Sequence, residues 1–78
     1  MQEKDQTLAG IEQDKQYRAS RVFNRALEVH VDEDAARRWI ARENRALGGV
    51  TPLSLLDTEA GYESVLDTLS RIETGVIS

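Results

Sequence analysis

The chain has no cysteine, which excludes disulfide bonds, a thiol nucleophile and metal sites built from thiolates. It has few aromatic residues and only one tryptophan, one histidine and one proline in 78 residues. A chain of this length forms one domain at most and buries only about 60% of its unfolded surface. Small cores of this kind often gain stability from a partner or from self-association.

Long apolar runs are also missing. No stretch approaches the ~20 residues that a membrane-spanning helix needs, and the polar residues 1–6 do not contain the apolar core of a signal peptide. The lack of cysteine fits a reducing compartment. We therefore expect a cytoplasmic protein that has no membrane partner.

Charge is unevenly distributed along the chain. The net charge of −4 argues against nucleic acid as the main partner, because phosphate binding needs an excess of lysine and arginine. Residues 15–45 are nevertheless basic, whereas residues 1–14 and 46–78 are acidic. This basic segment, which we call the basic middle, serves either docking to a partner or simple solvation.

Apolar residues recur at the three- and four-residue spacing that indicates helices. Helices are predicted at residues 17–30, 33–45, 52–57 and 59–74. Asp32, Thr51 and Thr58 are suitable N-caps, and Gly48-Gly49 and Gly75 are suitable stops. The sequence shows no strand alternation and no internal repeat. It predicts an all-α fold, a compact bundle of about four helices.

The first residues lack this period. Residues 1–16 are expected to form a flexible N-terminal segment, followed by one domain at residues 17–78. Within that domain, Trp39 shares its spacing with Ala35 and Ile40 and is expected in the core, packed against the last helix near Leu66 and Leu69. The alternative for Trp39 is a binding hot spot on the surface.

Catalytic chemistry is not indicated. His30 is the only histidine, and no serine or cysteine context marks a nucleophile beside it. A metal cluster of His30 with Asp32 and Asp34 is the alternative, but acids at that place are explained by the start of a helix. Gly48-Gly49 lacks the lysine of a phosphate loop. We expect a protein that is not an enzyme and holds no metal or cofactor.

A longer sequence motif runs from Trp39 to Gly75. A tryptophan-containing helix is followed by Asn-x-x-Leu-Gly-Gly-x-Thr-Pro, a leucine-rich turn, a glycine early in the last helix and a closing Leu-x-Arg-Ile-x-x-Gly. The matching residues are Trp39, Asn44, Leu47, Gly48, Gly49, Thr51, Pro52, Leu53, Leu56, Gly61, Val65, Leu69, Arg71, Ile72 and Gly75. From about Arg18 to Ser78, the chain resembles the C-terminal toxin-binding domain of the MbcA/ParS/Xre antitoxins. It departs at Glu43, where proline is common, and at Val50, where a basic residue is common.

The resemblance implies an antitoxin of a type II toxin-antitoxin system. Its partner would be a RES-domain toxin, an enzyme that consumes NAD, neutralised by covering its active-site entrance. NAD would then not be a ligand of this chain. Many family members carry an N-terminal helix-turn-helix domain, so the chain is either a minimal antitoxin or part of a longer one that binds DNA through the missing domain. The alternatives are a DNA-binding repressor module and a self-associating scaffold, and a homo-oligomer or a hetero-complex is expected.

The resemblance also places the toxin contacts. They are expected at Arg71, Gly75, Val76, Ile77, Ser78, Asn44 and Val50. Arg71 can make bidentate contacts to carboxylates of a pocket built for NAD; the alternative is that it caps the last helix carbonyls while the tail frays. A secondary docking surface is expected on two arginine rows, because arginine is enriched at interfaces. These rows are Arg18, Arg21 and Arg25, and Arg38, Arg42 and Arg45.

Overall fold

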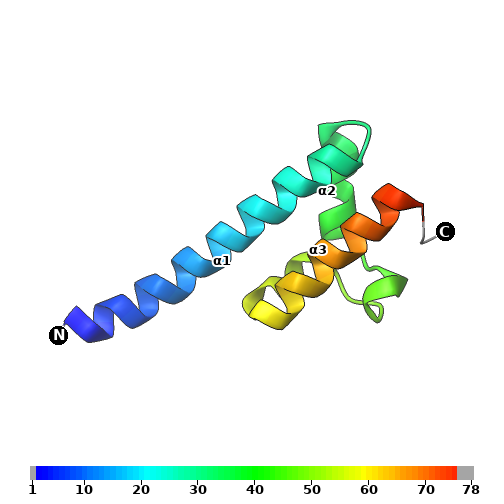
Figure 1. Ribbon diagram of the computed structural model, residues 1–78. Helices are drawn as coiled ribbons and strands as arrows, with labels where there is room; N and C mark the ends of the chain where they lie inside the picture. The colour runs from blue at the N-terminus through cyan, green and yellow to red at the C-terminus, as the bar shows by residue number, and fades with distance from the viewer. Residues whose placement is uncertain (1, 76–78) are drawn as a thin grey trace.

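The computed structural model describes residues 2–75, and their side chains from residue 13 onward. In the described residues the helices α1, α2 and α3 are joined by short connections (Figure 1). The elements are α1 (Gln2–Val29), α2 (Glu33–Ala41), the 3₁₀ helices η1 (Arg45–Leu47) and η2 (Leu53–Asp57), and α3 (Glu59–Thr74). The all-α prediction is confirmed, but the expected four helices are three α-helices and two 3₁₀ turns. None of the described helices is long and apolar enough to cross a membrane.

The long helix α1 organises the molecule. Its C-terminal half packs against α2, η2 and α3, while its N-terminal half extends past them (Figure 1). The prediction that the first helix begins at residue 17 is wrong, because the helix already begins at Gln2. Residues 2–16 are rich in good helix formers such as Gln, Glu and Lys, but they lack the apolar stripe that reveals a packed helix. The flexibility of residues 1–16 stays a prediction.

The core lies between α1, α3 and the elements that close over them. Its buried apolar side chains are Val22, Ala26, Ala36, Leu56, Tyr62, Val65 and Leu69. These residues recur at three- or four-residue spacing along α1 and α3, as predicted. Tyr17 and Leu27 of the same helix are exposed.

Capping side chains fix where the helices start. The Asp32 carboxylate accepts a hydrogen bond from the Ala35 amide at 2.8 Å, and the Thr58 hydroxyl accepts one from the Gly61 amide at 3.0 Å. Gly75 ends α3 with a left-handed φ of 78°, a conformation that costs glycine no Cβ strain. All three predictions are confirmed.

The end of α2 was predicted incorrectly. The helix stops at Ala41 rather than at residue 45, because Arg42 adopts an extended conformation with φ −103° and ψ 145°. The chain then bridges Asn44 to Val50 in antiparallel fashion. This pairing across the loop competes with further helix turns and has no sequence period of its own.

Trp39 lies at the edge of the core. The helix that carries it packs on α1, whereas α3 packs on α1, η1 and η2. The Trp39 side chain is half-buried against the core cluster, and its ring lies 5.7 Å from the ring of His30. Packing on the core is thus confirmed in part, and the expected contact with Leu66 and Leu69 stays a prediction.

Candidate partner-binding site

The loop from Asn44 to Val50 is organised by one asparagine. The Asn44 side-chain oxygen accepts a hydrogen bond from the Ala46 amide at 2.9 Å, and its backbone carbonyl accepts from the amides of Leu47 and Gly49. Its own amide donates to the Val50 carbonyl at 3.0 Å. Asn44 was predicted to contact the toxin. In the structure its side-chain oxygen and both backbone groups are bonded within the loop, and its contact with the toxin stays a prediction.

Two glycines let the loop turn back. Gly48 and Gly49 have φ values of 81° and 86°, in the left-handed region that other residues rarely adopt. The turn presents Val50 at the surface, where 40% of the residue is exposed. Val50 is therefore accessible to a partner, as the sequence prediction requires.

A groove of about 510 Å³ lies between this loop, η2 and α3. It is lined by Ala46, Leu47, Leu55, Thr58, Ala60, Gly61, Ser64, Asp67, Thr68 and Arg71. Sequence reasoning did not single out the small residues of α3 in this wall. Ala60, Ser64 and Thr68 do recur every four residues, and that spacing was the available signal of one shared helix face.

Gly61 allows the first turn of α3 to approach η2. A Cβ atom at this position would lie 2.0 Å from the carbonyl oxygen of Leu55, a separation at which atoms overlap. The glycine that the sequence motif contains early in the last helix therefore permits a backbone contact, and this contact forms one end of the groove.

Arg71 lies in the wall of the groove near the end of α3. Its side chain is 57% exposed and forms an ion pair with Asp67, one turn earlier, at 3.0 Å. The last carbonyls of α3 are capped by other groups: the Thr74 hydroxyl and the Gly75 amide both donate to the Arg71 carbonyl. An exposed pair of this kind contributes little to stability, so the guanidinium can exchange Asp67 for a partner carboxylate.

The other contacts predicted for the C-terminal end are Gly75, Val76, Ile77 and Ser78. Gly75 is the last residue that the structure describes. Val76, Ile77 and Ser78 lie outside the described residues.

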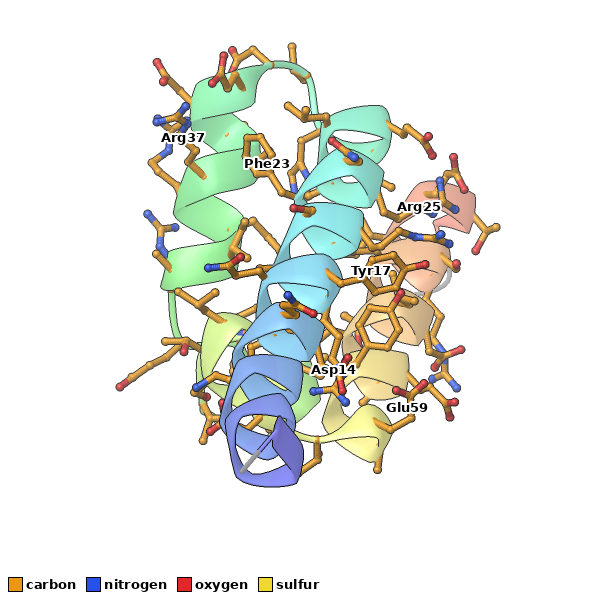
Figure 2. All side chains as sticks on the ribbon, turned by 90° about the vertical axis from the view of Figure 1, so that its left-hand side faces the viewer. Asp14, Tyr17, Phe23, Arg25, Arg37 and Glu59 are labelled. Atoms are coloured by element: carbon orange, nitrogen blue, oxygen red, sulfur yellow. The ribbon has the colours of Figure 1, made fainter. Side chains whose placement is uncertain are left out.

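The arginine row on α1 is largely committed to the fold. Arg18 donates to the Leu56 carbonyl at 3.0 Å and to the Asp57 carbonyl at 3.3 Å, which ties α1 to the end of η2. Arg25 reaches from α1 to α3 (Figure 2) and forms an ion pair with Glu73. Their positions do not support the expected docking role for these two arginines.

Two further side-chain contacts involve the arginines of α1. Arg25 also pairs with Glu28 at 2.8 Å, and Arg21 donates to the Tyr17 hydroxyl at 3.1 Å. The hydrogen bond from Arg25 holds the pKa of Glu73 below its usual range. The bonds to Glu73 and then Glu28 raise the pKa of Arg25 in return. The pair is therefore fully ionised at neutral pH and joins the two helices.

The arginine row that follows Trp39 is different. Arg38, Arg42 and Arg45 are exposed, and none of them forms an ion pair with another residue whose side chain the structure describes. Arg37, their neighbour, pairs with Glu33. The three arginines are thus available to a partner.

Metal chemistry has no support in this arrangement. Among the residues from 13 to 75, no three His, Cys, Asp or Glu side chains gather as metal ligands. The described surface offers a groove, an adjacent loop and exposed arginines, which together suit contact with another macromolecule.

Comparisons with known proteins agree with a contact surface. The family described as the antitoxin Xre/MbcA/ParS C-terminal toxin-binding domain matches residues 25–75. A protein named Antitoxin Xre from Photorhabdus laumondii is 44% identical over 59 residues, which are 74% of this chain and 40% of that protein. Another Antitoxin Xre, from Pseudomonas putida, is 30% identical over 73 residues, or 94% of this chain and 46% of that protein.

No solved structure matches this chain significantly. The chain spans less than half the length of the two curated relatives. The family match nevertheless covers the Trp39 helix, the Gly-Gly loop and α3, and it ends at the glycine that stops α3. The chain therefore belongs to the family of antitoxin Xre/MbcA/ParS C-terminal toxin-binding domains.

Proposed function

We propose that the chain is an antitoxin of a type II toxin-antitoxin system and that it binds and neutralises a RES-domain toxin. Family membership supports the antitoxin role, and the resemblance described above supplies the class of toxin. The proposed setting is the cytoplasm, where an enzyme that consumes NAD finds its substrate. The chain itself needs neither NAD nor a catalytic residue for this role.

One observation carries the mechanism: an exposed arginine lies in a groove wall at the end of α3. Arg71 is paired only with the exposed Asp67 among the described residues. A guanidinium makes two parallel hydrogen bonds to a carboxylate, a geometry that suits acidic side chains around an NAD pocket. In the proposed complex, Arg71 and the segment from Gly75 to Ser78 cover the entrance to the toxin's active site.

The loop beside the groove has a supporting role. Val50 offers an exposed apolar contact, and Asn44 holds the loop in shape through its hydrogen bonds. We propose that Val50 contacts the toxin directly and that Asn44 acts by positioning it.

The test combines truncation after Thr74 with Arg71→Ala, in cells that also express the RES-domain protein encoded next to this chain. We expect the altered chain to fold and to lose protection, seen as arrested growth and falling NAD. Arg37→Ala, which also removes an exposed arginine and loses an ion pair with Glu33 and a stacking contact with Phe23, is the matched control and should protect. Circular dichroism checks that both variants are helical.

A clear result opposes this mechanism. If the truncated Arg71→Ala chain folds and still protects cells as well as the wild type does, inhibition lies on another surface. If the wild-type chain forms no complex with the toxin, the proposed function itself is wrong.

A further inference from the structure

Three arginines next to the only tryptophan form a distinct surface. We name Arg38, Arg42 and Arg45 the basic cluster. Every other described arginine has a side-chain hydrogen bond or ion pair: Arg18, Arg21, Arg25, Arg37 and Arg71. The basic cluster has no such partner among the described side chains. Its positive charge is therefore not compensated by an ion pair within the described part of the chain.

Two arginines of the cluster, Arg38 and Arg42, share a hollow with the Trp39 ring. Arg38 and Arg42 line a hollow of about 200 Å³ together with Trp39 and His30. Trp39 is half-buried, so one part of the ring packs on the core and another part stays accessible. Tryptophan and arginine side by side are the residues most enriched at binding hot spots.

The charges favour a carboxylate-bearing protein as the occupant. Nucleic acid fits poorly, because the chain carries a net charge of −4 and a few arginines release few counterions from a duplex. A second copy of this chain is an occupant that the experiments below distinguish from the toxin.

We propose that the basic cluster and Trp39 form a second docking surface, which binds an acidic segment of the toxin that carries an apolar side chain. This inference rests on the proposed function and adds a contact remote from the inhibitory C-terminal end in sequence. Carboxylates of the segment pair with Arg38 and Arg42, and its apolar side chain covers the accessible edge of Trp39. Charge complementarity of this kind sets specificity and the rate of association.

The first experiment uses the single tryptophan as a probe. The full chain is labelled with 5-fluorotryptophan, and its one ¹⁹F resonance is followed as unlabelled, catalytically inactive toxin is added. We expect the resonance to shift on complex formation. A resonance that stays unchanged while gel filtration shows the complex would overturn the inference and leave the proposed function intact.

The second experiment measures affinity with a charge-matched control. Arg38→Gln with Arg42→Gln is expected to raise the dissociation constant at least about ten-fold at physiological salt, with less effect at high salt. Arg21→Gln with Arg37→Gln removes the same charge from residues outside the cluster and is expected to change it by less than about two-fold. Equal effects of the two double variants would mean that only total charge matters, which contradicts a docking surface.

Other occupants give different results. A ¹⁹F shift that depends on chain concentration without toxin would assign the surface to a second copy. A shift on adding a DNA duplex, with none on adding toxin, would assign it to nucleic acid. Either outcome overturns the inference. If the wild-type chain and toxin form no complex in gel filtration, the proposed function fails and the inference fails with it.

Discussion

At the scale of single residues, Gly61 is the position with the least room for change. Its missing side chain lets α3 begin against η2, and a Cβ atom would lie 2.0 Å from the Leu55 carbonyl oxygen. Alanine is the better helix former by about 1 kcal/mol, but overpacking a contact between two backbones costs more than this gain. The clash therefore makes the alanine substitution destabilising, despite the gain in helix propensity.

We expect Gly61→Ala to lower the free energy of unfolding by about 1–3 kcal/mol, as for other overpacked sites. Chemical denaturation followed by circular dichroism measures this. Ser64→Ala, an exposed change one turn later, is the control and should be neutral or slightly stabilising. An unchanged or higher stability of Gly61→Ala would show that α3 and η2 can separate without cost.

A second residue-scale prediction concerns the pair that joins α1 to α3. The hydrogen bond from Arg25 lowers the pKa of Glu73 in the folded protein. A carboxyl with a lowered folded pKa stabilises the protein above its unfolded pKa, about 4.3 for glutamate. That contribution is lost as the pH falls through the lower, folded value.

Glu73→Gln should therefore lower the Tm at neutral pH, and the difference from the wild type should shrink as the pH falls below the unfolded pKa and through the lower, folded one. Thermal melts at several pH values measure it. Glu63→Gln removes the same charge at an exposed site without breaking an ion pair that the structure shows, and serves as the control. A Tm difference for Glu73→Gln that is the same at every pH would rule out the ion pair as its cause.

At the scale of the elements, the loop before the groove depends on one side chain. Asn44 caps η1 through the Ala46 amide at 2.9 Å. We expect Asn44→Ala to cost about 1 kcal/mol, the usual effect of losing a cap, and to weaken toxin binding by loosening the loop. Urea denaturation and a binding titration measure the two effects. Glu63→Ala, an exposed change on α3 outside the groove and the hollow, is the control. Equal losses in both variants would show that Asn44 has no specific effect on the loop.

The sequence predicts the starts of the elements better than their ends. Asp32 and Thr58 act through amides three residues away, so a short stretch of sequence contains the whole interaction. The end of α2 depends instead on the bridge from Asn44 to Val50, and residues 2–16, where α1 begins, have no apolar stripe in the sequence. Neither feature has a local periodic signal.

In the candidate site, too, some features can be predicted from a short stretch of sequence and others depend on the fold. The closing motif drew attention to Arg71, which the structure places in the groove wall, and Val50 is exposed; their contacts with a toxin stay predictions. The arginine rows looked equivalent in sequence, yet Arg18 and Arg25 contact groups 38 and 48 residues away. Contacts that distant cannot be read from spacing along one helix, and only the fold separates structural arginines from available ones.

At the scale of the whole molecule, charge sets which partners are accessible. The net charge is −4, and the structure shows that much of the positive charge in the basic middle is used internally. The basic cluster of Arg38, Arg42 and Arg45 remains. Three arginines release few counterions from DNA, and each neutralised phosphate contributes about −0.9 to the slope of log K against log salt.

We therefore expect the 78-residue chain to bind its own promoter weakly. At physiological salt the dissociation constant should be no tighter than about 10⁻⁶ M, with equal affinity for a scrambled duplex and a salt slope no steeper than about −3. Fluorescence anisotropy with labelled duplexes at several salt concentrations measures all three. Arg38→Gln with Arg42→Gln should abolish even this binding, because it removes most of the uncompensated charge. Nanomolar binding that prefers the promoter would contradict the prediction, and it would reassign the basic cluster from an acidic protein segment to DNA phosphates.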